Sequence, residues 1–299
     1  SGTAAPEALF RTSGTTLGFE RRGEHAVLDL SLYHGSLLPN FAAHVLPDDA
    51  VLPMLSLIPP AAEIPDSSLS HMVSVVVERL GAPGSAFHAS VARGIDEAAL
   101  ERALDDFVAA GQPVCLLGTS LAFVHWLESL GRRGRRFRLP DGSRLMDTGG
   151  FKGHERQIAE GELRGAYEER LGIGADHCVN EYGMTEMLSQ FYDTVLRDRV
   201  RGAAPAGRDG APRRKGGPPW VRTVVVDPET LEPLPPGETG LLRHYDLANL
   251  GSVIGIQTED LGREVEGGFL LLGRAAGATP RGCSIAMDLL LRAARDEAP

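Results

Sequence analysis

The sequence predicts an α/β layered fold followed by a smaller β-rich part. Between residues 96 and 180, short apolar runs alternate with longer amphipathic segments, the order typical of strands covered by helices. Beyond residue 220, short strand-like runs alternate with turns that contain proline or glycine. The length of 299 residues corresponds to about two domains. A hydrophobic fraction of 42% allows the chain to bury a sizeable core.

Residues 96–110 form the clearest predicted helix. Asp96 is a suitable N-cap, because its carboxylate can accept hydrogen bonds from the free N–H groups of the first turn. Apolar residues recur on one helical face, and acidic residues such as Glu101 fall mostly on the other. Gly111 and Pro113 then end the helix.

The other expected elements follow from short apolar runs bounded by glycine or proline. We expect strands at residues 51–58, 114–117, 144–147, 178–180, 221–226, 240–244, 253–257 and 269–272. We expect further helices at residues 121–130 and 155–171. Residues 201–219 are rich in Gly, Pro, Ala and Arg, which predicts a flexible loop.

The net charge of -10 argues against a broad surface for nucleic acid or anionic membrane. No apolar run approaches the roughly 20 residues that a membrane span needs, so we expect none. Two basic runs, at residues 132–138 and 213–215, break the acidic pattern. Each is either solvated loop charge or a docking patch for an acidic partner, and the sequence leaves both interpretations open.

The three cysteines are too few and too scattered for a disulfide framework or a zinc site. This usage fits a reducing compartment, and we expect a cytoplasmic protein. Cys115 and Cys178 stand within apolar, strand-like runs, which predicts buried thiols. Cys283 stands in a polar setting near the end of the sequence.

A small, hydroxyl-rich stretch occupies residues 12–16, with the sequence TSGTT. Small residues around glycine let backbone N–H groups approach an anion, and the hydroxyls add further donors. The same composition is common in ordinary polar turns. It is not the common phosphate loop, because no Gly-Lys-Ser/Thr ending follows.

The stretch at residues 179–186 places an aromatic ring, a glycine, a hydroxyl and a carboxylate directly after a predicted strand. A second strand end, at Gly149, leads into a glycine-rich turn. Ligands of open α/β sheets bind beyond the carboxyl ends of strands. We therefore expect Gly149 and Tyr182 to form opposite walls of one pocket.

These motifs resemble those of the adenylate-forming superfamily of acyl- and aryl-CoA synthetases. The resemblance lies in TSGTT at 12–16, NEYGMTE at 180–186 and TED at 258–260. More narrowly, DTGGFKG at 147–153, NEYGMTEMLSQFYD at 180–193 and GRAAGATPRGCS at 273–284 are similar to the acyl-protein synthetases. These enzymes are the long-chain-fatty-acid–protein ligases of the bacterial luminescence fatty-acid reductase system.

The resemblance implies the fold of the superfamily's N-terminal domain, with ATP and Mg²⁺ as required partners. It implies a loop around the β- and γ-phosphates made by Thr12, Ser13, Gly14, Thr15 and Thr16. It implies an adenine pocket lined by Gly149 and Gly150 with Tyr182 stacked on the base, ribose contacts from Asp260, and Arg274 at the pocket edge. It also implies that Thr185 contacts the α-phosphate and that Glu186 is both catalytic and the magnesium ligand.

The implied organisation has four parts. Residues 1–200 form the α/β part that binds nucleotide and acyl group, 201–219 the flexible loop, 220–273 the β-rich subdomain, and 274–299 a tail that carries Cys283. As in the acyl-protein synthetases, we expect the mobile C-terminal domain of CoA synthetases, with its catalytic lysine, to be lacking.

The sequence departs from the superfamily pattern in two places. Leu17 stands where a glycine usually precedes a Pro-Lys-Gly run, and Arg21 and Arg22 are the nearest cations. Whether either arginine replaces the lysine is open. Glu259 stands where TGD has its glycine, and its charge beside Asp260 is unfavourable unless Glu259 points away.

The resemblance makes Cys283 the acyl acceptor, because acyl-protein synthetases pass the acyl group to a cysteine near their C-terminus. Arg281 would favour its thiolate. The alternative is that Cys283 is only a small residue packed in a turn, with no role in acyl transfer. The implied activity is fatty-acid activation to acyl-AMP with transfer to a protein thiol, for an acyl-accepting reductase or carrier protein. A ligase that feeds CoA or a carrier, and a non-catalytic nucleotide- or acyl-binding subunit, are the alternatives.

Overall fold

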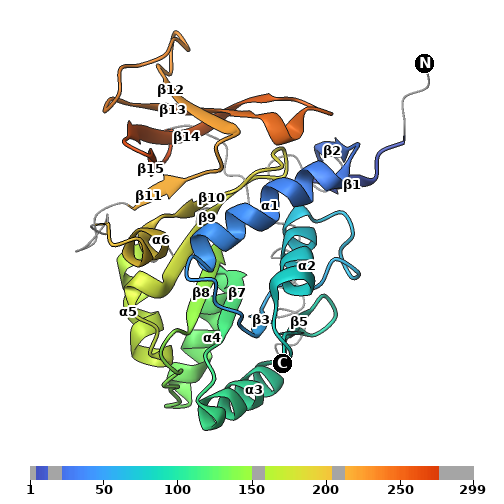
Figure 1. Cartoon of the computed structure of the whole chain (residues 1–299), viewed down its shortest axis with the longest axis vertical. Helices are drawn as coiled ribbons and strands as arrows, with labels where there is room; N and C mark the ends of the chain where they lie inside the picture. Colours follow the sequence, from blue (N-terminus) through green and yellow to red (C-terminus); the bar gives the residue numbers. More distant parts are fainter. Residues whose placement is uncertain (1–4, 13–21, 150–158, 204–212, 276–299) are drawn as a thin grey trace.

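The computed structural model describes residues 5–12, 22–149, 159–203 and 213–275. Among these residues, an 11-stranded mixed sheet runs through the molecule, and helices cover both faces of its parallel half (Figure 1). Two further sheets have two strands each. The predicted α/β layered fold with a β-rich C-terminal part is confirmed.

The elements have the following bounds. The strands are β1 (Ala8–Arg11), β2 (Glu24–Val27), β3 (Met54–Ser56), β4 (Ala86–Phe87), β5 (Ala89–Ser90), β6 (Gly94–Ile95), β7 (Cys115–Thr119), β8 (Arg144–Thr148), β9 (Cys178–Tyr182), β10 (Phe191–Asp193), β11 (Arg214–Gly216), β12 (Val221–Val226), β13 (Thr239–Asp246), β14 (Gly255–Val265) and β15 (Gly268–Arg274). The helices are α1 (Leu30–Val45), α2 (Ser68–Leu80), α3 (Glu97–Ala110), α4 (Ser120–Arg132), α5 (Glu160–Leu171) and α6 (Val195–Val200), with 3-10 turns η2 (Ala175–His177) and η3 (Leu247–Asn249).

Strands β4, β3, β7, β8 and β9 form the parallel half of the large sheet. Alternate side chains of a strand point to opposite faces. In β7, Cys115 and Leu117 pack in a cluster with α1 and α2, whereas Leu116 packs in a cluster with α3, α4 and α5. Burial on both faces explains why this strand is apolar without interruption.

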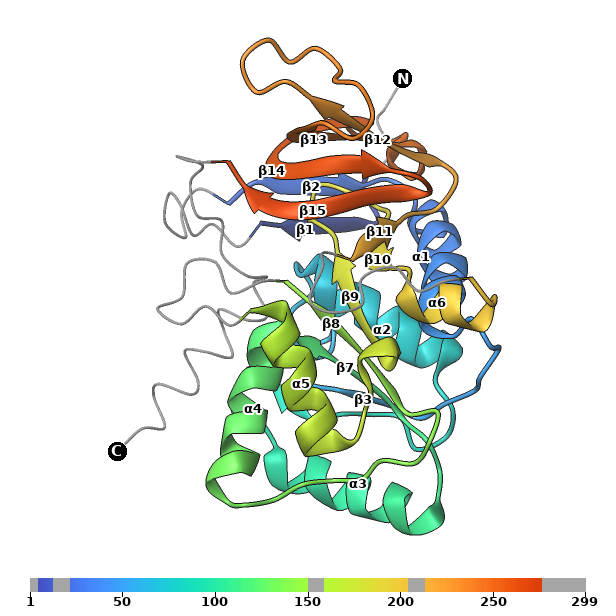
Figure 2. The same cartoon turned by 90° about the vertical axis from the view of Figure 1, so that its left-hand side faces the viewer.

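The antiparallel half begins at β10, which reverses direction beside β9. Strands β11, β15, β14, β13 and β12 follow in that order, each antiparallel to the one before. Figure 2 shows the last four at one end of the molecule. Strands on both sides of residues 201–219 therefore share one sheet, and the four-part division stays a prediction.

The helix predicted at residues 96–110 is confirmed as α3, with Asp96 as its N-cap. The Asp96 carboxylate accepts from Ala99 N at 2.9 Å, and Gly111 ends the helix in the left-handed conformation. The expectation for Glu101 is wrong, because this residue is buried. It forms ion pairs with Arg133 at 2.5 Å and Arg135 at 3.0 Å, which offset the cost of burying its charge.

The two basic runs differ. In residues 132–138, Arg132, Arg133, Arg136 and Arg138 are exposed, which agrees with solvated loop charge, and Arg133 and Arg135 also pair with acidic side chains of α3. In the second run, Arg213 and Lys215 are buried and pair with Asp193 of β10, so both interpretations are wrong for these two residues. The expectation of a flexible loop at residues 201–219 is wrong for the three residues that form strand β11. Residues 204–212 lie outside those described.

Several element bounds differ from expectation. Strand β3 covers only the middle of the strand expected at residues 51–58. The strand expected at residues 253–257 begins at Gly255 and continues to Val265, so residues 258–260 lie inside β14. The helix expected at 155–171 is described from Glu160 onward, and residues 155–158 are not described. Cys115 and Cys178 are buried free thiols, as predicted. Among the described residues, no helix combines the length and the apolar composition that crossing a bilayer requires.

Candidate active site

The carboxyl ends of β8 and β9 form the centre of the candidate site. The two strands are parallel neighbours, with Thr148 opposite Glu181. The chain leaves β8 at Gly149, where a φ of 80° favours glycine. A β-carbon at Gly149 would meet no described atom within 4 Å. Gly149 and Tyr182 thus lie at neighbouring strand ends. Their role as opposite walls of one pocket stays a prediction, and Gly150 is outside the described residues.

Tyr182 joins the parallel half of the sheet to the antiparallel half. Its hydroxyl donates to Asp260 Oδ2 at 2.8 Å, although the two residues are 78 positions apart. Its ring centroid lies 5.9 Å from that of Phe269 and 6.0 Å from that of Phe191. Burial and the Asp260 charge raise the pKa of the phenol well above its usual value, so the hydroxyl stays protonated and donates.

Arg274 contacts both of the adjacent carboxylates, those of Glu259 and Asp260. It lies opposite Asp260 in the β14–β15 pair. Its guanidinium contacts Glu259 Oε2 at 2.6 Å and Asp260 Oδ1 at 3.3 Å. One cation therefore offsets the repulsion between both acidic side chains, and the structure brings Tyr182, Asp260 and Arg274 into one cluster.

The Thr185–Glu186 segment follows β9, and side chains from other elements contact its backbone carbonyl oxygens. His25 Nδ1 lies 2.6 Å from the Thr185 carbonyl oxygen, and Asn249 Nδ2 donates to the Glu186 carbonyl at 2.9 Å. Ser68 Oγ, at the start of α2, donates to Thr185 Oγ1 at 3.4 Å. Because both carbonyls are engaged, the orientation of this segment is fixed from β2, η3 and α2.

Thr12 lies where β1 gives way to the predicted phosphate loop. Its N–H donates to the Gly23 carbonyl, and its hydroxyl accepts from Gly23 N, both at 2.9 Å. These bonds hold together the two ends of the intervening chain. Ser13, Gly14, Thr15, Thr16 and Arg21 all lie outside the described residues, and so does Cys283. Arg22 Nη1 lies 3.7 Å from Asp66 Oδ2.

Glu186 suits a magnesium ion by the type of its donor atoms. Magnesium prefers oxygen ligands and binds through one or two carboxylates plus substrate phosphates. Within the described part of the chain, no group of three or more His, Cys, Asp or Glu side chains is arranged to hold a metal.

Glu181 is a site residue that the sequence did not single out. It is buried, and Thr148 Oγ1 donates to its carboxylate. Burial raises its pKa to about 7, against an opposing effect of the Thr148 hydrogen bond and the Lys215 charge. A β-carbon at Gly183 would lie too close to this carboxylate, so a larger residue there would require Glu181 to shift. The period of two along β9 could have indicated that Glu181 points away from the face of Tyr182.

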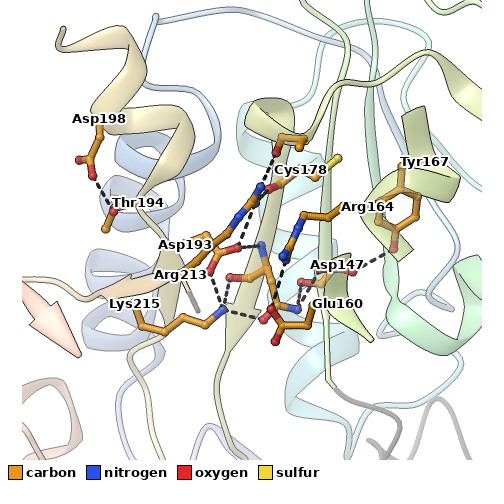
Figure 3. A network of polar contacts seen from close by, with 12 residues as sticks. Asp147, Glu160, Arg164, Tyr167, Cys178, Asp193, Thr194, Asp198, Arg213 and Lys215 are labelled. Atoms are coloured by element: carbon orange, nitrogen blue, oxygen red, sulfur yellow. Dashed lines mark hydrogen bonds and ion pairs between the residues drawn. The ribbon is translucent and has the colours of Figure 1, made fainter. Parts of the chain in front are cut away.

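A buried ion-pair network lies behind these strand ends (Figure 3). Lys215 Nζ contacts Asp193 Oδ1 at 2.9 Å, and Arg213 Nη1 contacts Asp193 Oδ2 at 3.4 Å. Arg213 also donates to the Cys178 carbonyl at 2.7 Å, at the start of β9. Arg213, directly before β11, and Lys215, within it, are thus internal structural groups.

The network continues into β8 and β9. Lys215 Nζ donates to Asn180 Oδ1 at 2.6 Å, and Asn180 Nδ2 donates to Asp147 Oδ1 at 2.9 Å. Tyr167 of α5 donates to Asp147 Oδ2 at 2.9 Å. Burial raises the pKa of Asp147. These bonds fix the strand register immediately before Gly149 and Tyr182.

Comparison with solved structures supports the fold. The chain is 17% identical to a 2-hydroxyisobutyryl-CoA ligase solved in an open conformation with 2-HIB-AMP and CoA, with a TM-score of 0.61 over 95% of this chain and 61% of that one. It is 19% identical to ATP-bound MatB from Rhodopseudomonas palustris, with a TM-score of 0.55 over 92% of this chain and 49% of that one. These similarities show that the fold is that of adenylate-forming enzymes.

Comparison with sequences identifies the family. A long-chain-fatty-acid–luciferin-component ligase of Vibrio harveyi is 26% identical over an alignment of 195 residues, which covers 62% of this chain and 48% of that protein. The chain thus spans about half the length of this curated relative. The family model described as "Acyl-protein synthetase, LuxE" matches residues 90–291, which is more than half of the chain. The chain therefore belongs to the LuxE family of acyl-protein synthetases.

Proposed function

We propose that this protein is an AMP-forming acid–thiol ligase that activates a fatty acid with ATP. The carboxylate oxygen of the acid attacks the α-phosphorus, the bond to the bridging oxygen breaks, and pyrophosphate leaves. The product is an acyl adenylate, a mixed anhydride that a thiolate attacks readily. Family membership and the adenylate-forming fold support acid activation.

The observation that carries the proposal is the contact between Tyr182 and Asp260. It unites an aromatic ring and a carboxylate from two motifs, next to the open strand end at Gly149. In the proposed site, adenine lies between Gly149 with Gly150 and the Tyr182 ring. Asp260 accepts hydrogen bonds from the ribose hydroxyls, and Arg274 borders the same pocket.

The phosphates lie on the other side of Tyr182 in this proposal. Thr185 contacts the α-phosphate, where charge builds up in the transition state. Glu186 holds Mg²⁺, which neutralises phosphate charge. The loop that grips the β- and γ-phosphates comprises Thr12, Ser13, Gly14, Thr15 and Thr16. The Thr12–Gly23 bonds hold together the two described ends of this segment, which supports the assignment.

We further propose that Cys283 accepts the acyl group. Its thiolate attacks the acyl carbon, the bond to the AMP oxygen breaks, and AMP leaves with the electron pair. The thioester keeps the acyl group activated for a reductase or carrier partner. The proposed location is the cytoplasm, where Cys115 and Cys178 would persist as the free thiols observed.

Trapping of the product tests the acceptor. The protein is incubated with ATP, Mg²⁺ and a labelled fatty acid, with CoA, with a carrier protein, or with neither. We expect a hydroxylamine-sensitive protein label without any added thiol, and none in Cys283→Ala. A label that persists in Cys283→Ala would exclude this residue, and acyl-CoA as the main product would favour a CoA ligase. ATP binding without pyrophosphate exchange for any acid would favour a non-catalytic subunit.

A further inference from the structure

His25 of β2 places both of its ring nitrogens against oxygen atoms. Nδ1 lies 2.6 Å from the Thr185 carbonyl oxygen, and Nε2 lies 2.9 Å from Asn249 Oδ1. A carbonyl oxygen has no hydrogen to donate. A ring nitrogen without a proton would therefore place its lone pair against the lone pairs of that oxygen.

The orientation of the Asn249 amide is fixed by its other contacts. Asn249 Nδ2 donates to the Glu186 and Val253 carbonyls, each at 2.9 Å. A flipped amide would place its oxygen against these two carbonyl oxygens, with two hydrogen bonds lost. The atom that faces His25 Nε2 is therefore the amide oxygen, and both ring nitrogens must donate.

His25 is buried, with a residue exposure of 6%. A ring with two N–H groups carries a positive charge, which is costly to bury without a partner. Among the described residues, no carboxylate forms an ion pair with His25. An anion that binds nearby would supply the missing counter-charge.

The location of His25 connects the two segments assigned to the phosphates. It pairs with Phe10 in the β1–β2 hairpin, whose ends at Thr12 and Gly23 are bonded to each other across residues 13–22. Across the site, it holds the Thr185 carbonyl directly and, through Asn249, the Glu186 carbonyl. A single side chain thus links the described β1–β2 hairpin to the Thr185–Glu186 segment.

We infer that His25 is a protonated positioning residue that fixes the Thr185–Glu186 segment relative to the β1–β2 hairpin and adds positive charge on the phosphate side of the site. The inference about phosphate rests on the proposed function. The ring's two N–H groups rest on the hydrogen-bond geometry alone.

His44 provides a matched control within the same molecule. It is also buried, but its Nδ1 donates to the Asn40 carbonyl at 2.9 Å and its Nε2 accepts from Arg197 at 2.8 Å. Its ring therefore carries one N–H. Burial lowers the pKa of His44 to about 4, in agreement with a neutral ring.

The test is a proton–nitrogen NMR spectrum of protein with ¹⁵N-labelled histidine at pH 7.5, assigned with His25→Gln and His44→Gln. We expect two ring N–H signals to disappear in His25→Gln and one in His44→Gln. Calorimetry of MgATP with the same proteins should show about tenfold weaker binding for His25→Gln and unchanged binding for His44→Gln.

One ring N–H signal from His25 would overturn the protonated state, and unchanged MgATP affinity in His25→Gln would overturn the positioning role. If wild-type protein binds no MgATP, the proposed function fails, and the NMR spectrum still decides the protonation of His25. Comparable thermal midpoints of the two variants exclude a general loss of stability as the cause.

Discussion

The Tyr182 hydroxyl donates to Asp260 Oδ2 at 2.8 Å and so fixes a strand-end aromatic ring against the antiparallel half of the sheet. The other carboxylate oxygen of Asp260, Oδ1, contacts Arg274 at 3.3 Å. The two contacts together set the orientation of the carboxylate that we assign to the ribose.

Tyr182→Phe keeps the ring and removes this hydrogen bond. We expect the KM for ATP to rise about tenfold, since hydrogen bonds to charged groups contribute about 1.5–3 kcal/mol. Tyr245→Phe alters an exposed tyrosine of β13 and should leave the KM unchanged. Equal KM values for Tyr182→Phe and wild type would show that the Tyr182 hydroxyl does not contribute to ATP binding.

Arg274→Gln leaves Glu259 and Asp260 without their shared cation. We expect ATP binding to weaken about tenfold, because repulsion between the carboxylates would displace Asp260. Glu259→Gln alone should change affinity little, since the contact between Arg274 and Asp260 remains. Combining the two substitutions should recover part of the loss. A double variant no better than Arg274→Gln would argue against charge repulsion as the cause.

Lys215→Met removes a buried cation from the network behind the site. Loss of one partner of a buried ion pair leaves the other charge poorly compensated, so we expect the free energy of unfolding to fall by about 3 kcal/mol. Arg199→Ala breaks a more exposed pair with Asp176 and should cost less than about 1 kcal/mol. Urea unfolding measures both, and similar losses in the two variants would contradict the buried network.

Glu181 predicts a pH dependence of stability. Burial raises the pKa of its carboxyl from 4.5 to about 7, so the folded protein holds this proton more tightly than the unfolded chain. The contribution of Glu181 to stability therefore falls as pH rises through this window. Glu181→Gln cannot ionise and should gain stability relative to wild type between pH 4.5 and 7, by at most about 3 kcal/mol. A stability difference that stays constant across this pH range would show that folding does not shift the pKa of Glu181.

Local signals predicted much of the fold. Helix α3 follows from the Asp96 cap and the Gly111 stop, both of which act within one turn of the chain. Strand β7 follows from its unbroken apolar run. Family motifs pointed to Tyr182, Asp260 and Arg274, and the sheet topology brings these three residues together.

What the sequence could not predict depends on partners distant along the chain. Lys215 is buried because Asp193 and Asn180 meet it from neighbouring strands, and its own neighbours in the sequence give no sign of this. Glu101 is buried because Arg133 and Arg135 reach it from beyond α4. The length of β14 is set by pairing with β13 and β15, so residues 258–260 became part of a strand.

The exchange of labelled pyrophosphate into ATP, measured with and without fatty acid, tests acid activation most directly. We expect exchange that requires both the fatty acid and Mg²⁺ and that falls at least a hundredfold in Glu186→Ala, because loss of a charge-stabilising group at the reacting phosphate costs roughly 3 kcal/mol. Glu229→Ala, in the β12–β13 turn, should exchange at the wild-type rate. Exchange that is absent from the wild-type protein with every fatty acid, or that is unchanged in Glu186→Ala, would contradict the account.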